Sequence, residues 1–362
     1  MYANVFKHFG NATAVDNFSL TVNKRELLTL LGPSGCGKTT TLRMTAGLET
    51  VDSGSILING KDVTTVPIYR RNLGMVFQNY ALFPHMTVFD NLAFGLKFRK
   101  KTKNETTKLV DEALRLVALP GFGDRYPRQL SGGQQQRIAL ARALVIEPEV
   151  LLLDEPLSNL DMKLRRKMRL EIRRIQREVG ITTIYVTHDQ EEALTMSDRV
   201  AIMNAGRIMQ VGRPREIYQC PNSQFVANFI GEPNLLHGRI LSANREFVIS
   251  IDSQRKVIAM LQNASSEKPA SVGDSVSLCL RPERVELNEK SIHKNSFAGE
   301  IGIIEYLGSF VRYYVDLGRG LTLACTRQMG LGEPVRSLGE KVYIGWEPED
   351  CLVLPEERTG EF

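Results

Sequence analysis

The sequence has no long hydrophobic run. Apolar stretches such as Leu27–Leu31 and Val150–Leu153 are far shorter than the roughly 18 residues that a membrane-spanning helix requires. The first residues, Met1–Lys7, also lack the long apolar core of a secretory signal. We therefore expect a chain that does not cross a bilayer by itself and that works in the cytoplasm.

Cysteine is scarce, and no residue class is strongly over-represented. The five cysteines are odd in number and far apart, with no C-x-x-C pair and no histidine at metal-ligand spacing: Cys36, Cys220, Cys279, Cys325 and Cys351. This pattern argues against a structural zinc site and against a disulfide framework. Hydrophobic residues at 43% and charged residues at 24% of the 362 positions are typical of folded globular chains and exclude a collagenous or disordered protein.

Positive charge is concentrated in one part of the chain. The net charge is +5, but residues 1–232 hold 31 Lys and Arg against 23 Asp and Glu, and the remainder holds 15 against 18. An anionic ligand is therefore expected in the first part.

Short strand-like runs alternate with longer helical patterns between Val15 and Gly212, which is typical of an α/β architecture. Apolar runs predict strands at Leu27–Leu31, Ser55–Asn59, Leu73–Phe77, Val150–Leu153, Thr182–Val186 and Val200–Met203. The stretch between Phe77 and Val150 is mostly helical, with apolar residues at helical spacing in Lys103–Val117. We predict a helical subdomain over residues 80–148, approximately.

The sequence pattern changes from helical to strand-like near residue 232. Two short helical patterns, Arg215–Gln219 and Gln224–Ile230, lead to Gly231–Asn234, and strand signals separated by Gly, Asp and Asn dominate beyond it. The predicted domains are 1–232 and an all-β domain over 233–362. Within the latter, Gly273–Glu283 matches Gly339–Glu349 in its Gly, acid, Val, Pro and Glu positions. Two copies of a small barrel module would give this repeat, although a repeat this short also arises by chance.

The strongest local signal is a P-loop, which lies between a predicted strand and a predicted helix. Its glycines allow successive backbone N–H groups to surround phosphates at a helix N-terminus. Lys38 is expected to reach the β- and γ-phosphates, and the Thr39 hydroxyl to ligate Mg²⁺. The candidate nucleotide-binding residues are Gly32, Pro33, Ser34, Gly35, Cys36, Gly37, Lys38, Thr39 and Thr40.

Two acidic residues end the apolar run Val150–Leu153. A buried strand would deliver Asp154 to the magnesium ion and place Glu155 beside the γ-phosphate, where a general base could polarise water. An apolar run followed by Asp-Glu is also a common end of an ordinary strand. The position downstream of a P-loop favours the catalytic interpretation.

A second glycine-rich segment, Ser131-Gly132-Gly133-Gln134, directly precedes a helical pattern. A hydroxyl and two glycines at a helix N-terminus form an anion site without a lysine. Ser131 is equally a good N-cap residue of an ordinary helix. One nucleotide does not require two such sites, so the second needs an explanation.

Together these segments resemble the ATPase subunit of ABC transporters over residues 1 to about 230. Further motifs of that family follow in order: Gln78 at the Q-loop position, Leu157–Asp161 at the D-loop, and His188 at the switch histidine. Phe9 stands where the family has an aromatic residue that stacks on adenine. The resemblance implies ATP and Mg²⁺ as ligands, with a P-loop NTPase fold.

The resemblance also explains the surplus anion site. Two such ATPases pack head to tail, so that Ser131, Gly132, Gly133, Gln134 and Asp161 of one subunit meet the nucleotide on the P-loop of the other. It further implies that Gln78 senses Mg²⁺ and the attacking water, with metal ligation shared with Thr39 and Asp154. Glu155 would polarise the water and His188 would contact the γ-phosphate.

The implied partners are a second copy, two membrane permease subunits and, indirectly, an extracytoplasmic substrate-binding protein, with no nucleic acid. The segment Tyr80–Thr87 corresponds to the family region that receives a short helix of the permease. The chain would then lie at the cytoplasmic face of the cell membrane. The basic runs Phe98–Lys103 and Lys163–Arg177 lack interleaved aromatics, and we interpret them as solvated helix faces.

The tail resembles the paired OB-like (TOBE) barrels of ABC import ATPases for sugars, polyamines, sulfate and iron. Arg71–His85 and Trp346–Leu354 are most similar to the spermidine/putrescine import type. The sequence departs from the family pattern in one respect. In the family the first strand usually starts several residues before the position of Asn4-Val5, whereas this sequence starts at Met1. Whether the first strand is complete, and whether it supports Phe9, therefore stays open.

Two other classes stay open: a soluble ABC ATPase acting on nucleic acid or ribosomes, and a regulatory protein whose tail senses a metabolite.

Overall fold

The computed structural model describes residues 1–99, 101–260, 271–330 and 332–356. Contacts divide the chain into two units, Met1–Arg215 and Glu216–Phe362, and each is described by itself. The division precedes the boundary predicted near residue 232 because the short helix α8 (Gln224–Phe229) packs on strand β14 (Ser275–Leu280) of the second unit.

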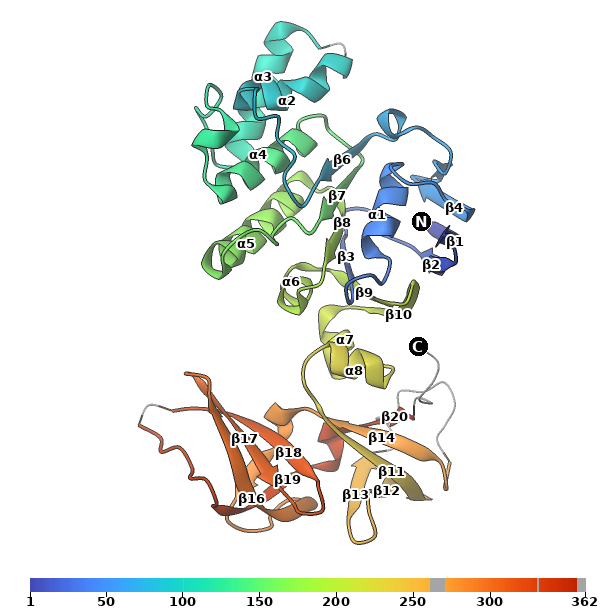
Figure 1. Ribbon diagram of the computed structural model, residues 1–362, viewed down its shortest axis with the longest axis vertical. Helices are drawn as coiled ribbons and strands as arrows, with labels where there is room; N and C mark the ends of the chain where they lie inside the picture. The colour runs from blue at the N-terminus through green and yellow to red at the C-terminus, as the bar shows by residue number, and fades with distance from the viewer. Residues whose placement is uncertain (100, 261–270, 331, 357–362) are drawn as a thin grey trace. The chain divides into compact units, whose positions relative to one another are not determined.

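A six-stranded sheet forms the centre of the first unit (Figure 1). Its order is β10-β9-β3-β8-β7-β6, parallel except for the edge pair β10–β9. The strands are β3 (Leu27–Leu31), β6 (Leu73–Val76), β7 (Val150–Asp154), β8 (Thr182–Thr187), β9 (Arg199–Asn204) and β10 (Arg207–Gly212). These are the apolar runs expected of a parallel sheet buried on both faces.

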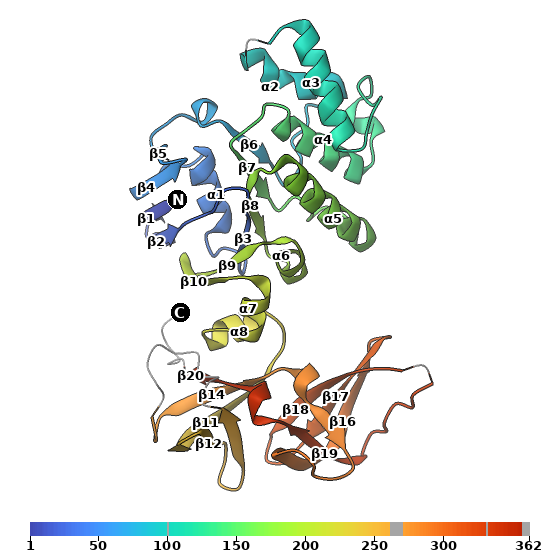
Figure 2. The ribbon, with the colours of Figure 1, turned by 180° about the vertical axis from the view of Figure 1, so that it is seen from behind.

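Successive residues of these strands belong to two different cores. Leu151 and Leu153 of β7 pack with Ile172 of helix α5 (Met162–Val179). Leu152 packs with Leu42 of helix α1 (Lys38–Ala46) on the opposite face. Figure 2 shows the same arrangement from behind, with α1 and α5 on opposite sides of the strands. The period-two alternation of strands thus produces a three-layer α/β unit.

An antiparallel sheet flanks α1 in the order β2-β1-β4-β5. Its strands are β1 (Tyr2–Phe9), β2 (Ala12–Leu20), β4 (Ser53–Ile58) and β5 (Lys61–Asp62). The buried Lys7 of β1 pairs with Glu49 at 3.0 Å and with Asp52 at 3.2 Å, so an ion-pair cluster fixes this strand to the loop before β4.

Helices fill the segment between β6 and β7, as the apolar spacing predicts. They are α2 (Val88–Leu96), α3 (Lys103–Leu116) and α4 (Gly132–Leu144), followed by α5 and then by α6 (Gln190–Met196) after β8. Thr102 and Glu105 form a capping box at the start of α3, which is the sequence signature of a helix N-terminus. None of the helices in the described part of the chain is long and apolar enough to span a membrane.

The second unit contains two five-stranded antiparallel sheets after the short helices α7 (Pro214–Gln219) and α8. The first sheet has the order β13-β12-β11-β14-β20 and the second β15-β19-β16-β17-β18. The strands are β11 (Asn234–Ala243), β12 (Glu246–Ser250), β13 (Lys256–Met260), β14, β15 (Glu286–Asn288), β16 (Asn295–Tyr306), β17 (Phe310–Asp316), β18 (Thr322–Gln328), β19 (Lys341–Trp346) and β20 (Cys351–Pro355). The all-β prediction for the tail is confirmed.

The short sequence repeat is structural. Each copy forms a strand and the start of a 3₁₀ turn that begins at a proline (Pro282 or Pro348), and a second short strand follows each copy. The strand that follows each copy pairs with the strand inside the other copy, as β20 with β14 and β15 with β19. The repeat thus exchanges edge strands between the two sheets, which joins them into one unit.

Arg281, in the first copy of the repeat, binds the short helices to the first sheet. Its guanidinium donates to the carbonyls of Ala227 at 3.1 Å, Ile230 at 2.7 Å and Tyr218 at 2.9 Å, and it stacks on the Tyr218 ring. The second copy has Glu347 at this position, where it pairs with His293. The buried arginine explains why the short helices belong to the second unit.

Candidate functional site

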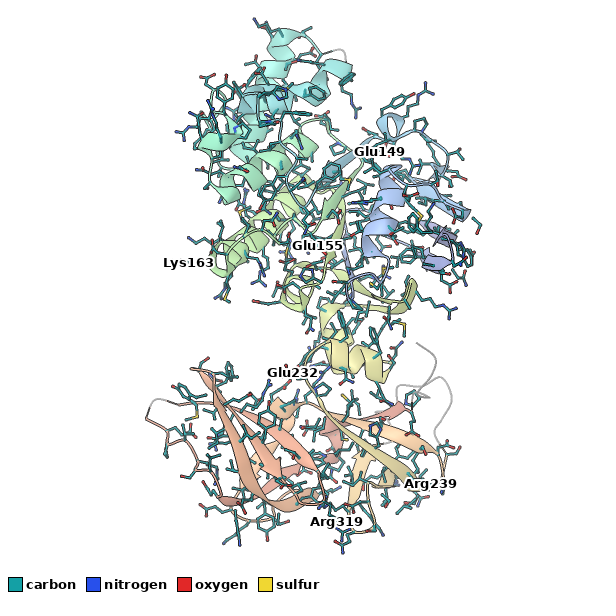
Figure 3. The ribbon with its side chains drawn as sticks, in the orientation of Figure 1. Glu149, Glu155, Lys163, Glu232, Arg239 and Arg319 are labelled. Atoms are coloured by element: carbon teal, nitrogen blue, oxygen red, sulfur yellow. The ribbon has the colours of Figure 1, made fainter. Side chains whose placement is uncertain are left out.

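The predicted nucleotide and catalytic residues follow four neighbouring parallel strands at one edge of the central sheet. The P-loop follows β3, Gln78 follows β6, Asp154 and Glu155 end β7, and His188 follows β8. Because the strands are parallel and in register, their carboxyl ends meet at the same edge. Figure 3 shows Glu155 at this edge of the strands.

The P-loop needs glycine at two tightly packed positions. Gly37 has φ 101° and caps α1, and a Cβ there would lie 2.3 Å from the carbonyl oxygen of Ala14. A Cβ on Gly32 would meet the carbonyl oxygen of Met203 at the same distance. A side chain at either position would therefore displace backbone. The loop is held against β2 and β9, and the free N–H groups of α1 open toward it.

Lys38 lies inside the curve of the loop. Its Nζ donates to the carbonyls of Gly32 and Pro33, each at 2.8 Å, and the residue is only 5% exposed. Burial raises the pKa of the Cys36 thiol, so this P-loop cysteine stays protonated and poorly nucleophilic. The Lys38 ammonium group, and not the Cys36 thiol, is thus the chemically active side-chain group of the loop.

Thr39 and Asp154, two of the three predicted magnesium ligands, are brought together. The Thr39 hydroxyl donates to Asp154 Oδ1 at 3.3 Å. Burial raises the pKa of Asp154 above its ordinary value, against the opposing effect of the Thr39 hydrogen bond. A divalent cation would favour the ionised carboxylate here, and hydroxyl and carboxylate oxygens are the donors that Mg²⁺ prefers. The residues present therefore fit a magnesium ion.

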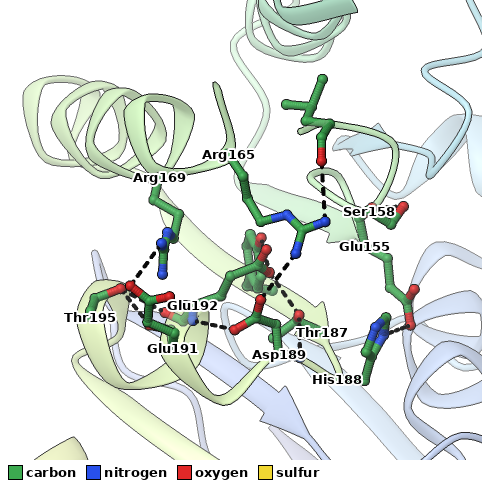
Figure 4. Close-up of polar contacts among 12 residues, drawn as sticks. Glu155, Ser158, Arg165, Arg169, Thr187, His188, Asp189, Glu191, Glu192 and Thr195 are labelled. Atoms are coloured by element: carbon green, nitrogen blue, oxygen red, sulfur yellow. Dashed lines mark hydrogen bonds and ion pairs between the residues drawn. The ribbon is translucent and has the colours of Figure 1, made fainter. Parts of the chain in front are cut away.

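Glu155 and His188 form a pair, with His188 Nδ1 at 3.2 Å from Glu155 Oε1 (Figure 4). Glu155 has a left-handed backbone with φ 43°, and its N–H donates to the carbonyl of Val186 on the neighbouring strand. Such a conformation is uncommon outside glycine and recurs at functional sites. It turns the Glu155 side chain out of the sheet and toward His188.

Gln78 is exposed and is joined to the D-loop through its backbone. Its carbonyl accepts a hydrogen bond from Asn159 Nδ2 at 2.9 Å, and Ser158 Oγ donates to the carbonyl of Glu155 at 3.0 Å. The D-loop therefore contacts both the segment after β6 and the segment after β7. Sequence reasoning placed these motifs in order along the chain but missed the bonds between them.

Phe9 lies at the end of β1, with half of its surface exposed. The adjoining strand β2 supplies Ala14, which contacts the P-loop at Gly37. The half-exposed Phe9 ring is compatible with stacking on a base.

The second anion site lies beside the start of α5. Ser131 and Gln134 form a capping box at the N-terminus of α4, so the ordinary cap and the predicted anion site share the same atoms. A Cβ on Gly132 or Gly133 would lie next to Leu160 or Leu164, respectively. The residues predicted to act in a partner's site are thus neighbours, because Asp161 lies between these two leucines as the N-cap of α5.

The basic run on α5 is not simply a solvated face, which corrects the sequence interpretation. Arg165, Arg169 and Arg173 recur every four residues and pair with Asp189 at 3.4 Å, Glu191 at 2.9 Å and Asp198 at 3.0 Å. Arg169 is only 5% exposed. The four-residue spacing of the arginines was the available signal, since it places them on one helix face.

Comparisons with known proteins agree with this geometry. The ABC transporter family matches residues 15–158 and the TOBE domain family matches residues 278–354. Curated relatives include the spermidine/putrescine import ATP-binding protein PotA of Rubrobacter xylanophilus, 48% identical over 98% of this chain and 93% of the relative. PotA of Trichodesmium erythraeum is 45% identical over 98% and 94%, respectively. The Fe(3+) ions import ATP-binding protein FbpC of Brucella abortus is 50% identical over 88% of each chain.

Solved structures resemble the first part of the chain. The dimeric post-hydrolysis state of the ATP-binding cassette MJ0796 bound to ADP and Pi is 31% identical, with a TM-score of 0.53 over 59% of this chain and 98% of that one. The cbiO1 protein of Clostridium perfringens, part of the ABC transporter complex cbiONQ, is also 31% identical, with a TM-score of 0.56 over 60% and 88%. The chain belongs to the ATP-binding subunits of ABC importers, ATPases that carry a C-terminal TOBE domain.

Proposed function

We propose that this chain hydrolyses ATP to drive polyamine import through an ABC transporter. The observation that carries the proposal is the convergence of the P-loop, Gln78, Asp154, Glu155 and His188 at one edge of the central sheet. Hydrolysis needs a phosphate cradle, a metal site and a base in one place, and this edge provides all three.

The proposed division of labour follows from the contacts. The N–H groups of residues 32–40 and the Lys38 ammonium hold the phosphates, and Phe9 stacks on the adenine. Thr39, Asp154 and Gln78 would hold Mg²⁺, which would supply the positive charge that neutralises the phosphates. Glu155 polarises the attacking water, and His188 orients Glu155 and contacts the γ-phosphate.

We infer a head-to-tail homodimer. The segment Ser131–Gln134 and Asp161 are neighbours beside the start of α5, so a second copy can present them together to the nucleotide. The solved MJ0796 structure is dimeric, which supports a dimer of this chain. Each dimer would then bind two ATP molecules between its subunits.

A preformed loop is suited to receive a permease helix. Arg142 donates to the carbonyls of Tyr80 at 3.0 Å and Ala81 at 2.7 Å, and the fully buried Asn91 donates to the carbonyl of Phe83 at 3.1 Å. The segment Tyr80–Thr87 is thus held rigidly while several of its side chains stay exposed. Rigid loops with exposed apolar groups lose little entropy on binding. The segment also begins two residues after Gln78, which connects docking to the site.

The cargo assignment comes from the relatives. Several PotA proteins match nearly the whole chain at 45–48% identity, whereas the iron import relative covers 88% of it. A role with iron, sugar, sulfate or an organic amine is the alternative. In either case the chain works at the cytoplasmic face of the cell membrane with two permeases, an extracytoplasmic binding protein delivers the cargo, and nucleic acid is not a partner.

Co-purification tests the transport role. Affinity-tagged full-length chain is isolated from detergent-solubilised membranes of its native cell, and integral membrane subunits should co-purify. The Phe83→Ala variant should reduce that recovery, whereas Phe310→Ala, the same change at an exposed phenylalanine of the second unit, should not. Uptake of labelled spermidine into proteoliposomes carrying the recovered complex then tests the cargo. Recovery of the chain without membrane subunits would contradict the proposal.

A further inference from the structure

Arg165 connects the D-loop to the loop that carries His188. Its Nη2 donates to the carbonyl of Leu160 at 3.2 Å, and its Nη1 pairs with Asp189 Oδ2 at 3.4 Å. Figure 4 shows the Arg165 guanidinium directed toward Asp189. Leu160 immediately precedes Asp161, and Asp189 immediately follows His188. A single side chain thus contacts the residue next to each of two predicted site residues.

Asp189 fixes the backbone on both sides of itself. Its N–H donates to Thr187 Oγ1 at 3.0 Å, and its Oδ1 accepts from the N–H of Glu192 at 3.1 Å as the N-cap of α6. Thr187 Oγ1 in turn donates to the buried Glu192 carboxylate at 2.7 Å. His188 therefore sits in a loop whose two flanking residues are hydrogen-bonded, so a displacement of Asp189 would move His188.

The other end of the link is equally connected. Asn159, one residue before Leu160, donates to the carbonyl of Gln78, and Ser158 donates to the carbonyl of Glu155. The D-loop therefore contacts the Q-loop and the backbone of the proposed base directly, and Arg165 joins it to the His188 loop. Arg165 thus completes a chain of hydrogen bonds that connects the Q-loop, the segment of Glu155, the D-loop and the His188 loop.

Packing of α5 against α6 does not require the link between Arg165 and Asp189. Arg169, one turn further along α5, pairs with Glu191 of α6 at 2.9 Å and is more deeply buried than Arg165. Hydrophobic contacts of Met168 and Ile172 with the core hold α5 independently. The Arg165 side chain is about a third exposed, and its two Nη groups contact two loops instead. A solvent-accessible ion pair contributes little to stability, so a role in positioning the loops accounts for it better.

We propose that Arg165 is a positioning residue that holds the D-loop and the His188 loop in register, so that the two loops act together during hydrolysis. The inference rests on the proposed roles of Glu155, His188 and the D-loop. In the proposed dimer the same link would transmit the position of Asp161, at the partner's nucleotide, to His188 at the chain's own nucleotide.

The test compares two isosteric variants of full-length chain. Asp189→Asn keeps an N-cap side chain but removes the charge that pairs with Arg165, and Glu191→Gln removes the pair that joins the same helices without contacting either loop. For each we measure kcat and KM for MgATP, ATP affinity by fluorescent nucleotide titration, and the melting temperature. Asp189→Asn should lower kcat about tenfold, with ATP affinity changed less than about twofold. Glu191→Gln should leave kcat at the wild-type value.

A double-mutant cycle and a conservative variant separate positioning from simple damage. Arg165→Met combined with Asp189→Asn should be no slower than the slower single variant, because both changes remove one link. Arg165→Lys should recover part of the lost kcat, since an ammonium can reach one of the two partners but lacks the fork that reaches both. Equal kcat for Asp189→Asn and Glu191→Gln would overturn the inference, as would strictly additive losses in the cycle.

Glu155→Gln is measured in parallel, so that the two proposals fail separately. If Glu155→Gln hydrolyses ATP normally, the proposed base is wrong. If Glu155→Gln is inactive and Asp189→Asn is normal, only the role of Arg165 is wrong.

Discussion

His188 and Glu155 lie on adjacent strand ends with Nδ1 and Oε1 3.2 Å apart. The register of β7 and β8 pairs Asp154 with Val186, so Glu155 and His188 follow that pair by one and two residues. The left-handed backbone at Glu155 then turns its carboxylate to the histidine. The contact is therefore a consequence of strand register and of one strained residue, and it places a carboxylate and an imidazole together beside the P-loop.

Lys38 should be necessary for nucleotide binding. Replacement by Ala removes the ammonium group that donates to the loop carbonyls of Gly32 and Pro33, so a charge-assisted contact to phosphate is lost. We expect ATP affinity to fall at least about tenfold, since tenfold corresponds to about 1.4 kcal/mol. Fluorescent nucleotide titration checks this, with Lys24→Ala as a control outside the P-loop. Unchanged affinity would refute the P-loop assignment.

Thr39 should determine the magnesium requirement. Thr39→Val keeps the shape of the side chain but removes the hydroxyl that lies beside Asp154, whereas Thr39→Ser keeps that hydroxyl. The valine variant should need about tenfold more Mg²⁺ for half-maximal hydrolysis, and the serine variant should resemble wild type. Activity is measured against Mg²⁺ concentration at fixed ATP. A valine variant with the wild-type Mg²⁺ requirement would exclude Thr39 as a ligand.

Glu192 should make stability depend on pH. Burial raises its pKa above the ordinary value of 4.5, in opposition to hydrogen bonds from Thr187 and Tyr185. For a raised pKa the contribution to stability is complete below the unfolded-state pKa and is lost as pH rises through the folded-state pKa. Glu192→Gln cannot ionise, so its melting temperature relative to wild type should rise between pH 4 and pH 7, approximately. A difference that does not vary with pH would contradict this account.

Arg281 should stabilise the second unit. Arg281→Met leaves the carbonyls of Ala227, Ile230 and Tyr218 without this donor, in a site where the arginine is 7% exposed. The expected cost is roughly 2–4 kcal/mol in the unfolding of this unit, followed by chemical denaturation. The control is Arg284→Met, whose ion pair with Asp350 at 3.7 Å is exposed and should contribute less than about 1 kcal/mol. If the two variants lost the same free energy of unfolding, the contacts of Arg281 would not be a special source of stability.

The sequence was sufficient to predict the fold class and the strands that bear the site. Buried parallel strands appear as continuous apolar runs, and the P-loop and the acidic pair stand directly at their ends, so local patterns identify both. The roles of Phe9, Gln78 and His188 came from family resemblance and stay predictions here. The pairing of His188 with Glu155 depends on strand register, which no local pattern specifies.

Contacts between distant segments were beyond the sequence. Arg165 and Asp189 are far apart in the sequence, and the four-residue spacing of the α5 arginines indicates a shared helix face but not the acidic residues that pair with it. The repeat at Gly273–Glu283 and Gly339–Glu349 was visible, but the exchange of edge strands between its copies was not. Pairing partners in antiparallel sheets are set by the whole sheet, so a repeated segment does not reveal them.

The most direct test of the account is ATP hydrolysis by the Glu155→Gln variant of full-length chain. We predict that hydrolysis falls by about 10²-fold or more, the range of general-base catalysis, while ATP binding is retained. Glu149→Gln is the control, since Glu149 precedes the same strand and bonds to Asn59 and Asn72 outside the site (Figure 3). Hydrolysis by Glu155→Gln at the wild-type rate would contradict the central claim that Glu155 activates the attacking water at this sheet edge.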